Sequence, residues 1–136
     1  MCRWMAYSGS PLPLDLLLYR TQHSLIDQSM SSRSAETPTN GDGFGIGWYG
    51  PSGKSGLYRS IRPAWNDFNL RDLSAHIESS MMLAHVRATS QATVQETNCH
   101  PFRYQEWLFV HNGEIFEIEK FRRDLLFAIG PEYFSS

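Results

Sequence analysis

The sequence has few cysteines, no cluster of basic residues and no long hydrophobic run. Its 136 residues include two cysteines, Cys2 and Cys99, and in a chain without an export signal we expect two reduced thiols rather than a disulfide. The longest apolar run near the start, Leu16-Leu17-Leu18, is far too short to cross a bilayer. The formal net charge is −2 and no Lys/Arg cluster occurs, so neither nucleic acid nor a membrane is an expected partner.

The start of the sequence also lacks a basic segment followed by an apolar one. No signal peptide is therefore predicted, and a cytoplasmic location is expected. This matters for Cys2, because a secretory leader would remove it. What the sequence does contain is a globular composition, with 41% hydrophobic and 19% charged residues. Its length is sufficient for one domain with its own core.

The hydrophobic pattern predicts a mixture of strands and helices. Residues 2–7 are expected to form a short strand that Ser8-Gly9-Ser10-Pro11 ends, and the polar segment from Ser29 to Gly41 is expected to be a long loop. Helices are expected at 15–19, around 70–77 and at 118–129, and further strands at 44–48, 57–61, 81–86 and 107–111, the last two buried. Strands joined by short turns favour antiparallel pairing, with helices covering the sheets.

The stretch GDGFGIGWYG predicts a strand with one bare face. Phe44, Ile46 and Trp48 alternate with glycines, which is the period of a strand. The opposite face then carries no side chains, so another backbone or a ligand can approach it closely.

Cys2 stands directly behind the initiator methionine. A small residue at this position usually allows the methionine to be removed, so that Cys2 would carry both its thiol and a free α-amino group. The thiolate is the nucleophilic form, and an α-amino group, which titrates near about pH 7.7–8.0, can act as the neighbouring base. The alternative is that Cys2 occurs here by chance.

Two further motifs place polar groups at the ends of expected strands. In HVRATS, Arg87 ends a strand, and its guanidinium can bind a carboxylate with two hydrogen bonds; the alternative is an ordinary structural salt bridge. In HNGEI, the Asn112 amide and the Gly113 N–H can form an oxyanion hole, in which one donor contributes about 2.7–4 kcal/mol. The alternative for this pair is a plain Asn-Gly turn.

The stretch NCHPF contains residue types that bind metals. Cys99 and His100 are adjacent, and His85 and His111 could complete a set of ligands. No CxxC or HxxxH spacing is present, however, so we expect no metal site. The favoured interpretation is a turn that borders a strand, with Phe102 in the core.

Taken together, these motifs resemble the class II glutamine amidotransferases, which are N-terminal-nucleophile hydrolases. The resemblance is closest to the stand-alone branch that contains amidohydrolases acting on γ-glutamyl compounds. The matching segments are Met1-Cys2-Arg3, NGDGFGIGWY, HVRATS, NCHPF and FVHNGEI, which follow the family's order along the chain.

The resemblance implies an α+β fold, a four-layer αββα sandwich of largely antiparallel sheets. It implies that Cys2 is the nucleophile with its α-amine as base, and that Asn112 and Gly113 hold the oxyanion. Arg87 would bind the α-carboxylate of glutamine, and Ser90 would line the same pocket. The implied substrate is glutamine or a γ-glutamyl small molecule, and no metal or organic cofactor is implied.

The chain departs from the pattern of this family at one point. In the family, an Asp in a Ser/Thr-Asp-Ser-Glu type motif meets the substrate's ammonium group, and this chain ends about where that motif should begin. Residues 1–136 are therefore expected to be the N-terminal portion of a type 2 glutamine amidotransferase domain and a poor enzyme alone. A missing C-terminal half, or a protein that processes the nitrogen acceptor, would be its partner. His85 and His111 would fix strand ends rather than transfer protons.

Two alternatives stay open. One is a different N-terminal-cysteine amidase, such as a bile-salt or penicillin-amide hydrolase; Arg87 and the Asn112-Gly113 pair argue against it, because they suit a small amino-acid substrate. The other is a truncated, non-catalytic protein that binds a partner, which the missing acidic motif supports.

Overall fold

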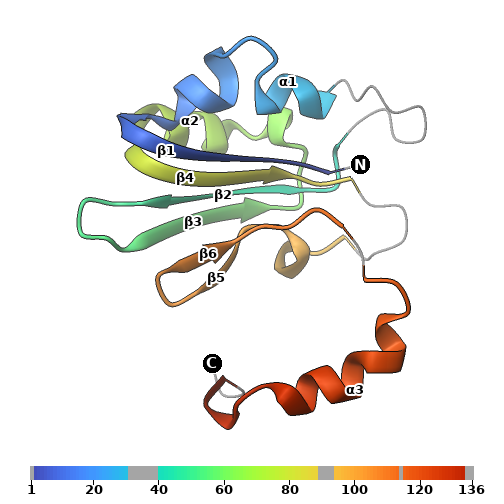
Figure 1. Ribbon diagram of the computed structural model, residues 1–136. Coiled ribbons are helices and arrows are strands. Elements are labelled where there is room, and N and C mark those ends of the chain that lie inside the picture. Colours follow the sequence, from blue (N-terminus) through green and yellow to red (C-terminus); the bar gives the residue numbers. More distant parts are fainter. Residues whose placement is uncertain (1, 31–39, 89–93, 114, 134–136) are drawn as a thin grey trace.

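The structure, a computed structural model, describes residues 2–30, 40–88, 94–113 and 115–133 (Figure 1). Its strands are β1 (Arg3–Pro13), β2 (Phe44–Tyr49), β3 (Ser55–Ser60), β4 (Glu78–Val86), β5 (Phe102–Tyr104) and β6 (Trp107–Phe109). Its α-helices are α1 (Leu25–Met30), α2 (Phe68–His76) and α3 (Ile118–Ala128). A π-helical turn covers Leu16–Arg20, and short 3-10 turns cover Ala64–Asn66, Glu96–Asn98 and Pro131–Tyr133.

Four strands form an antiparallel sheet in the order β1-β4-β2-β3, and β5 and β6 form a separate antiparallel pair. Because β4 lies between β1 and β2, Trp4 and Gly45 both lie opposite His85. Helices and antiparallel sheets occur in one chain, which confirms the predicted α+β class.

The elements are stacked in layers (Figure 1). α1 and α2 cover one face of the four-stranded sheet, β5 and β6 lie on its other side, and α3 lies beyond them. The hydrophobic core is formed where the sheet meets α1, α2 and the segment after β1. Its buried apolar residues are Leu14, Leu18, Leu25, Ile26, Phe44, Ile46, Ala64, Leu70, Met82, Ala84 and Val86.

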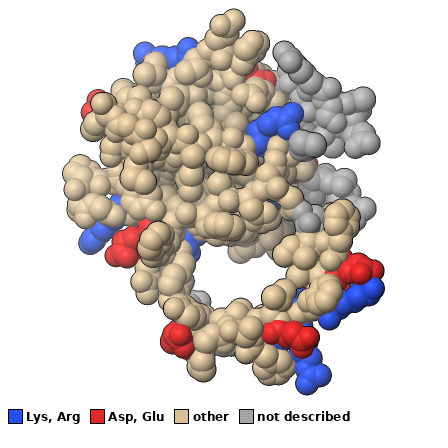
Figure 2. All heavy atoms as spheres, viewed as in Figure 1, with Lys and Arg blue, Asp and Glu red and all other residues tan. Residues whose placement is uncertain are grey.

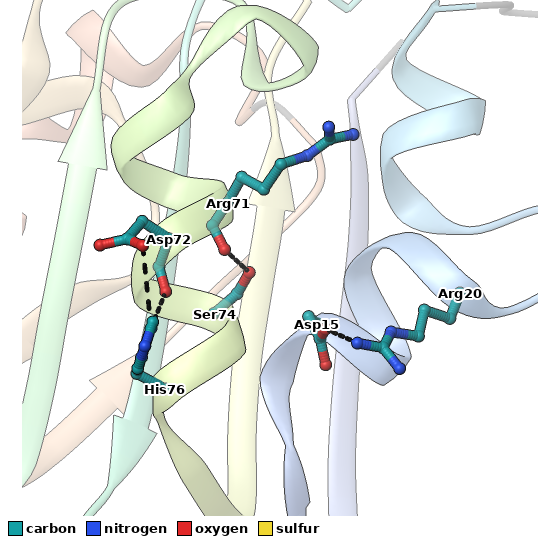
Figure 3. A network of polar contacts seen from close by, with 6 residues as sticks. All are labelled: Asp15, Arg20, Arg71, Asp72, Ser74 and His76. Atoms are coloured by element: carbon teal, nitrogen blue, oxygen red, sulfur yellow. Dashed lines mark hydrogen bonds and ion pairs between the residues drawn. The ribbon is translucent and has the colours of Figure 1, made fainter.

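Polar contacts fix the helical layer. Asp67 caps the start of α2, since its Oδ1 accepts a hydrogen bond from the Leu70 backbone N–H at 2.8 Å. In the turn after β1, Arg20 Nη2 lies 2.6 Å from Asp15 Oδ2 (Figure 3). These local contacts stabilise the start of α2 and the turn after β1, while the apolar core packs the helices against the sheet.

The bare face of β2 lies against the β5–β6 layer. A Cβ atom added to Gly45 would overlap the carbonyl oxygen of His100, and one added to Gly47 would lie 2.7 Å from Leu108 Cδ1. Phe44 and Ile46, on the opposite face, are buried in the core. The prediction that another backbone approaches the glycine face is confirmed.

The predicted end of the first strand at Ser8-Gly9-Ser10-Pro11 is wrong, because β1 continues to Pro13. The register against β4 shifts between Ser8 and Leu12, after which Leu12 pairs with Ser79. A β-bulge of this kind accommodates extra residues without ending the strand pairing.

The prediction of a buried strand at 107–111 is wrong in its extent and its burial. β6 ends at Phe109, and Trp107 and Phe109 are 74% and 59% exposed. Only Leu108 between them points at the glycine face of β2. The predicted loop from Ser29 to Gly41 begins later than expected, since α1 reaches Met30, and residues 31–39 lie outside the described part of the chain.

The helix predicted at 118–129 is confirmed as α3, which contains no buried residue. Its exposed surface carries neighbouring opposite charges (Figure 2), including the ion pairs of Lys120 with Glu117 and of Arg122 with Glu119. Figure 2 also shows an open space between the α3 region and the rest of the molecule. None of the helices in the described residues has the length and apolar character needed to cross a membrane.

Candidate active site

A pocket of about 330 Å³ lies where the start of β1, the end of β4 and the segment after β6 meet. Arg3 pairs with Val86, which places Cys2 beside the end of β4. The residues that line the pocket are Cys2, His85, Arg87, Ala88, Asn98, His100, Phe102, His111, Asn112 and Gly113. Four of the five predicted site residues line this pocket together, and Ser90 lies outside the described residues.

Cys2 is half-buried and is held at the end of β4 through its sulfur. Its Sγ lies 3.3 Å from the Ala88 carbonyl oxygen, to which the thiol donates, and the Ala88 N–H donates to the sulfur at 3.4 Å. These two contacts join residues that are far apart in the sequence. They fix the thiol at the pocket wall, where a ligand could reach it.

Arg87 follows directly on β4 and is only 6% exposed. Its backbone N–H donates to the Gly43 carbonyl oxygen at 2.8 Å, and its own carbonyl accepts from the Asp42 N–H at 3.1 Å. Its Nη1 donates to the Asp42 carbonyl oxygen at 3.5 Å. Strand pairing therefore continues past β4 and directs a buried guanidinium to the pocket, where it can bind a carboxylate.

Asn112 contacts the residue that carries the thiol. Its Nδ2 donates to the Cys2 carbonyl oxygen at 2.9 Å. An amide nitrogen carries two hydrogens, so this bond leaves a second N–H for a ligand. Gly113 follows with a φ of +151°, a value that favours glycine. Both residues are exposed, so a ligand in the pocket can reach them.

Three histidines at the pocket differ in burial. His85 and His100 are 1% and 9% exposed, whereas His111 is exposed. Burial, reinforced by neighbouring histidines and Arg87, lowers the pKa of His85 to about 3 and that of His100 to about 4. Both imidazoles are therefore neutral near pH 7.

Asn98, His100 and Phe102 also line the pocket, which the sequence does not predict. The NCHPF stretch predicts a turn with Phe102 in the core, whereas Phe102 is half-buried at the pocket wall. The glycine face of β2 is the signal that could have located them, because Gly45 is where the His100 backbone approaches the sheet.

The expectation about a metal site also concerns this segment. Cys99 is fully buried and is not among the pocket residues, and its Sγ donates to the Ser60 carbonyl oxygen at 3.4 Å. Within the described ranges, no group of three or more His, Cys, Asp or Glu residues is arranged to hold a metal ion.

The fold is a layered α+β fold, and one pocket is lined by Cys2, Arg87, Asn112 and Gly113. A sequence profile of the family described as "Glutamine amidotransferases class-II" matches residues 19–131. The chain therefore belongs to the class II glutamine amidotransferases, as the resemblance of its motifs predicted.

Particular relatives share most of this chain's length. A "Probable glutamine amidotransferase DUG3" from Saccharomyces cerevisiae is 41% identical over 98% of this chain and 40% of that protein. A "Gamma-glutamyl-hercynylcysteine sulfoxide hydrolase" from Mycolicibacterium smegmatis is 33% identical over 83% of this chain and 51% of that protein.

A solved structure of a "glutamine aminotransferase class-II domain protein" from Silicibacter pomeroyi superimposes with a TM-score of 0.66 at 31% identity. The match covers 98% of this chain and 46% of that one. The chain thus spans about half or less of the length of these three relatives.

Proposed function

We propose that this chain supplies the amide-cleaving site of a glutamine amidotransferase or amidohydrolase, which acts on glutamine or a γ-glutamyl compound through a thioester on Cys2. The observation that carries the proposal is the hydrogen bond between Asn112 Nδ2 and the Cys2 carbonyl oxygen, formed in a pocket that Arg87 also lines. A nucleophile, an oxyanion donor and a carboxylate-binding group are what cleavage of an amino-acid amide requires.

In the proposed reaction, the Cys2 thiol gives its proton to the α-amine exposed by removal of Met1, and the sulfur attacks the γ-carbonyl carbon. Asn112 Nδ2 and the Gly113 N–H stabilise the resulting oxyanion. The α-ammonium then protonates the leaving nitrogen, the C–N bond breaks, and a thioester and ammonia or an amine result. Water, deprotonated by the same α-amine, hydrolyses the thioester and releases the γ-carboxylate and the thiol.

Arg87 is proposed to bind the α-carboxylate of the substrate, with Ser90 as a further residue of that subsite. No step needs a metal or an organic cofactor. The nitrogen is released as ammonia or an amine, or it passes to an acceptor that a partner protein processes. The relative named as a γ-glutamyl hydrolase supports a γ-glutamyl substrate alongside glutamine itself.

The test is hydrolysis of L-glutamine and of γ-glutamyl-p-nitroanilide by the full-length protein, together with its intact mass. We expect turnover of at least one substrate, and an active preparation whose chain begins at Cys2. A preparation that retains Met1 on every chain and still turns over substrate would contradict the α-amine mechanism. A protein that begins at Cys2 and hydrolyses neither substrate would favour the non-catalytic alternative.

Arg87→Lys is expected to lower kcat/KM for glutamine by roughly 10- to 150-fold. Lysine keeps the charge but loses the bidentate fork, and a hydrogen bond to a charged group contributes about 1.5–3 kcal/mol. The measurement is steady-state kinetics with glutamine and with 4-aminobutanamide, which is glutamine without its α-carboxylate. The loss should be confined to glutamine.

Arg122→Lys is the matched control, because Arg122 lies on α3 with 66% of its side chain exposed. It should leave the kinetics unchanged. Equal losses for both substrates in a folded Arg87→Lys protein, or no loss for either, would return Arg87 to a purely structural role.

A further inference from the structure

Three imidazole rings that line the pocket together with Cys2 lie in a row in tilted contact, and we call this row the stack. The His100 ring lies in the middle, with its centroid 4.4 Å from that of His85 and 4.5 Å from that of His111. Phe102 closes the stack from the side, 4.3 Å from His100 in an edge-on arrangement. Such centroid distances are those of rings in direct contact.

Each of the two outer histidines lies close in the sequence to a predicted site residue. His85 lies two residues before Arg87, and His111 directly precedes Asn112. β4 and β6 belong to different sheets, so no ladder of backbone hydrogen bonds joins them. Side chains must therefore set the distance between the segments, and His100 lies between the two outer rings.

Gly45 makes room for the middle ring. It lies opposite His85 in the sheet, and its missing side chain allows the His100 backbone to approach. The core residues Ala84 and Val86 alternate with His85 along β4, so the His85 ring lies on the glycine face of the sheet, toward the second layer. The stack therefore depends on how the side chains of β2 and β4 alternate between the two faces of the sheet.

We propose that His85, His100 and His111 form a stack of imidazole rings that positions the Asn112–Gly113 donors relative to Cys2. His100 is the positioning residue, since it contacts both outer rings and acts through His111 on Asn112. The stack transfers no proton in the reaction. This role rests on the proposed function, because it matters for catalysis only if Cys2 and Asn112 act on the same substrate.

The buried surroundings of His85 and His100 favour the neutral form of these two rings. Within the part of the chain that the structure describes, neither ring nitrogen of His85 has a hydrogen-bond partner, and nor has Nδ1 of His100. An imidazolium there would be desolvated and repelled by the guanidinium of Arg87. The titratable and charged groups around His100 are His85 from β4, Arg87 directly after β4, His111 after β6, Cys2, Cys99, and Arg59 from β3.

The sign of the pH dependence follows from the lowered pKa values. The unfolded chain binds protons on these histidines near pH 6.5, whereas the folded chain does so on His100 only near pH 4 and on His85 near pH 3. Between these values the unfolded state holds more protons, so the free energy of unfolding falls as the pH decreases from 6.5 through 4. The stabilisation by neutral histidines is fully present above pH 6.5.

The test uses His100→Ala and His100→Phe in the full-length protein, with His76→Ala on the exposed end of α2 as the matched control. His100→Ala should lower kcat at least tenfold while KM changes less than threefold, because an oxyanion donor acts mainly in the transition state. His100→Phe retains a ring in the stack and should keep kcat within about threefold. His76→Ala should behave as wild type.

A second measurement does not depend on activity. The free energy of unfolding of wild type, from urea titrations between pH 7 and pH 4, should fall more steeply with decreasing pH than that of His100→Phe, which lacks the titrating group. If His100→Ala does not fold, the proposal is tested by kcat of His100→Phe and by this comparison of unfolding free energies between wild type and His100→Phe.

The results separate two failures. A wild-type protein that hydrolyses no γ-glutamyl substrate overturns the proposed function, while the pH comparison still tests the stack. With an active wild type, three results would each overturn the proposed role of the stack. The first is full kcat in a folded His100→Ala protein, and the second is a tenfold or greater loss of kcat in His100→Phe. The third is an equal dependence of the free energy of unfolding on pH in wild type and His100→Phe.

Discussion

Replacing Cys2 by alanine should lower turnover of glutamine by a factor on the order of 10⁴ or more, the scale seen when a catalytic nucleophile is removed. Alanine leaves the backbone and the α-amine in place, so only the sulfur that forms the thioester is lost. Cys2 makes two contacts to Ala88 through its Sγ. Because Cys2 is only half-buried, the loss of these contacts should have little effect on folding. The measurements are single-turnover kinetics, and mass spectrometry of the acyl-enzyme on wild type and variant.

Cys99→Ser is the control for this experiment. Cys99 is fully buried, burial raises the pKa of its thiol, and its Sγ donates to the Ser60 carbonyl oxygen, a bond that a serine hydroxyl can also form. The Cys99 thiol is therefore a poor nucleophile, and Cys99→Ser should keep most of the activity. Turnover that survives in Cys2→Ala, or disappears only in Cys99→Ser, would show that the thioester is not on Cys2.

The part of the fold that follows local periodicity could be predicted from the sequence. The alternation of Phe44, Ile46 and Trp48 with glycines gave both the strand and the close approach to its bare face. The helical spacing at 118–129 likewise gave α3. In both segments the pattern arises from the covalent order of residues and the geometry of one element, so no knowledge of distant contacts was needed.

Predictions that depended on distant partners were wrong. Ser8-Gly9-Ser10-Pro11 contains strong turn residues, yet β1 continues because pairing with β4 resumes at Leu12 beyond a bulge. Trp107 and Phe109 are hydrophobic enough for a core but are exposed, since Leu108 is the residue of β6 that lies against the sheet. A tertiary contact decides these cases, and the local sequence does not record it.

The candidate site shows the same division. Cys2, Arg87, Asn112 and Gly113 were selected from the chemistry of their side chains and the ends of predicted strands, and the structure places them at one pocket. Asn98, His100 and Phe102 were not assigned to it, because their position depends on how closely the second layer approaches β2. That approach is set by the missing side chain of one glycine.

Gly45→Ala should therefore be strongly damaging, although Gly45 does not line the pocket. The added Cβ would overlap the carbonyl oxygen of His100, which is backbone and cannot rotate away as a side chain could. Either β2 or the segment around His100 must move. Overpacking of this kind costs about 1–3 kcal/mol of stability. Displacing catalytic groups by about 1 Å can cost roughly 10²-fold in rate, so we expect at least that loss in kcat/KM.

Gly50→Ala supplies the matched control. Gly50 follows β2 directly, and a Cβ there would meet only the Lys54 carbonyl oxygen at an ordinary 3.7 Å. Its stability should stay within about 0.5 kcal/mol of wild type, the range of most surface substitutions, and its activity should be unchanged. The measurements are urea unfolding at pH 7 and steady-state kinetics on both variants. If Gly45→Ala is as stable and as active as Gly50→Ala, the backbone of His100 does not lie against β2, and the glycine face does not set the geometry of the site.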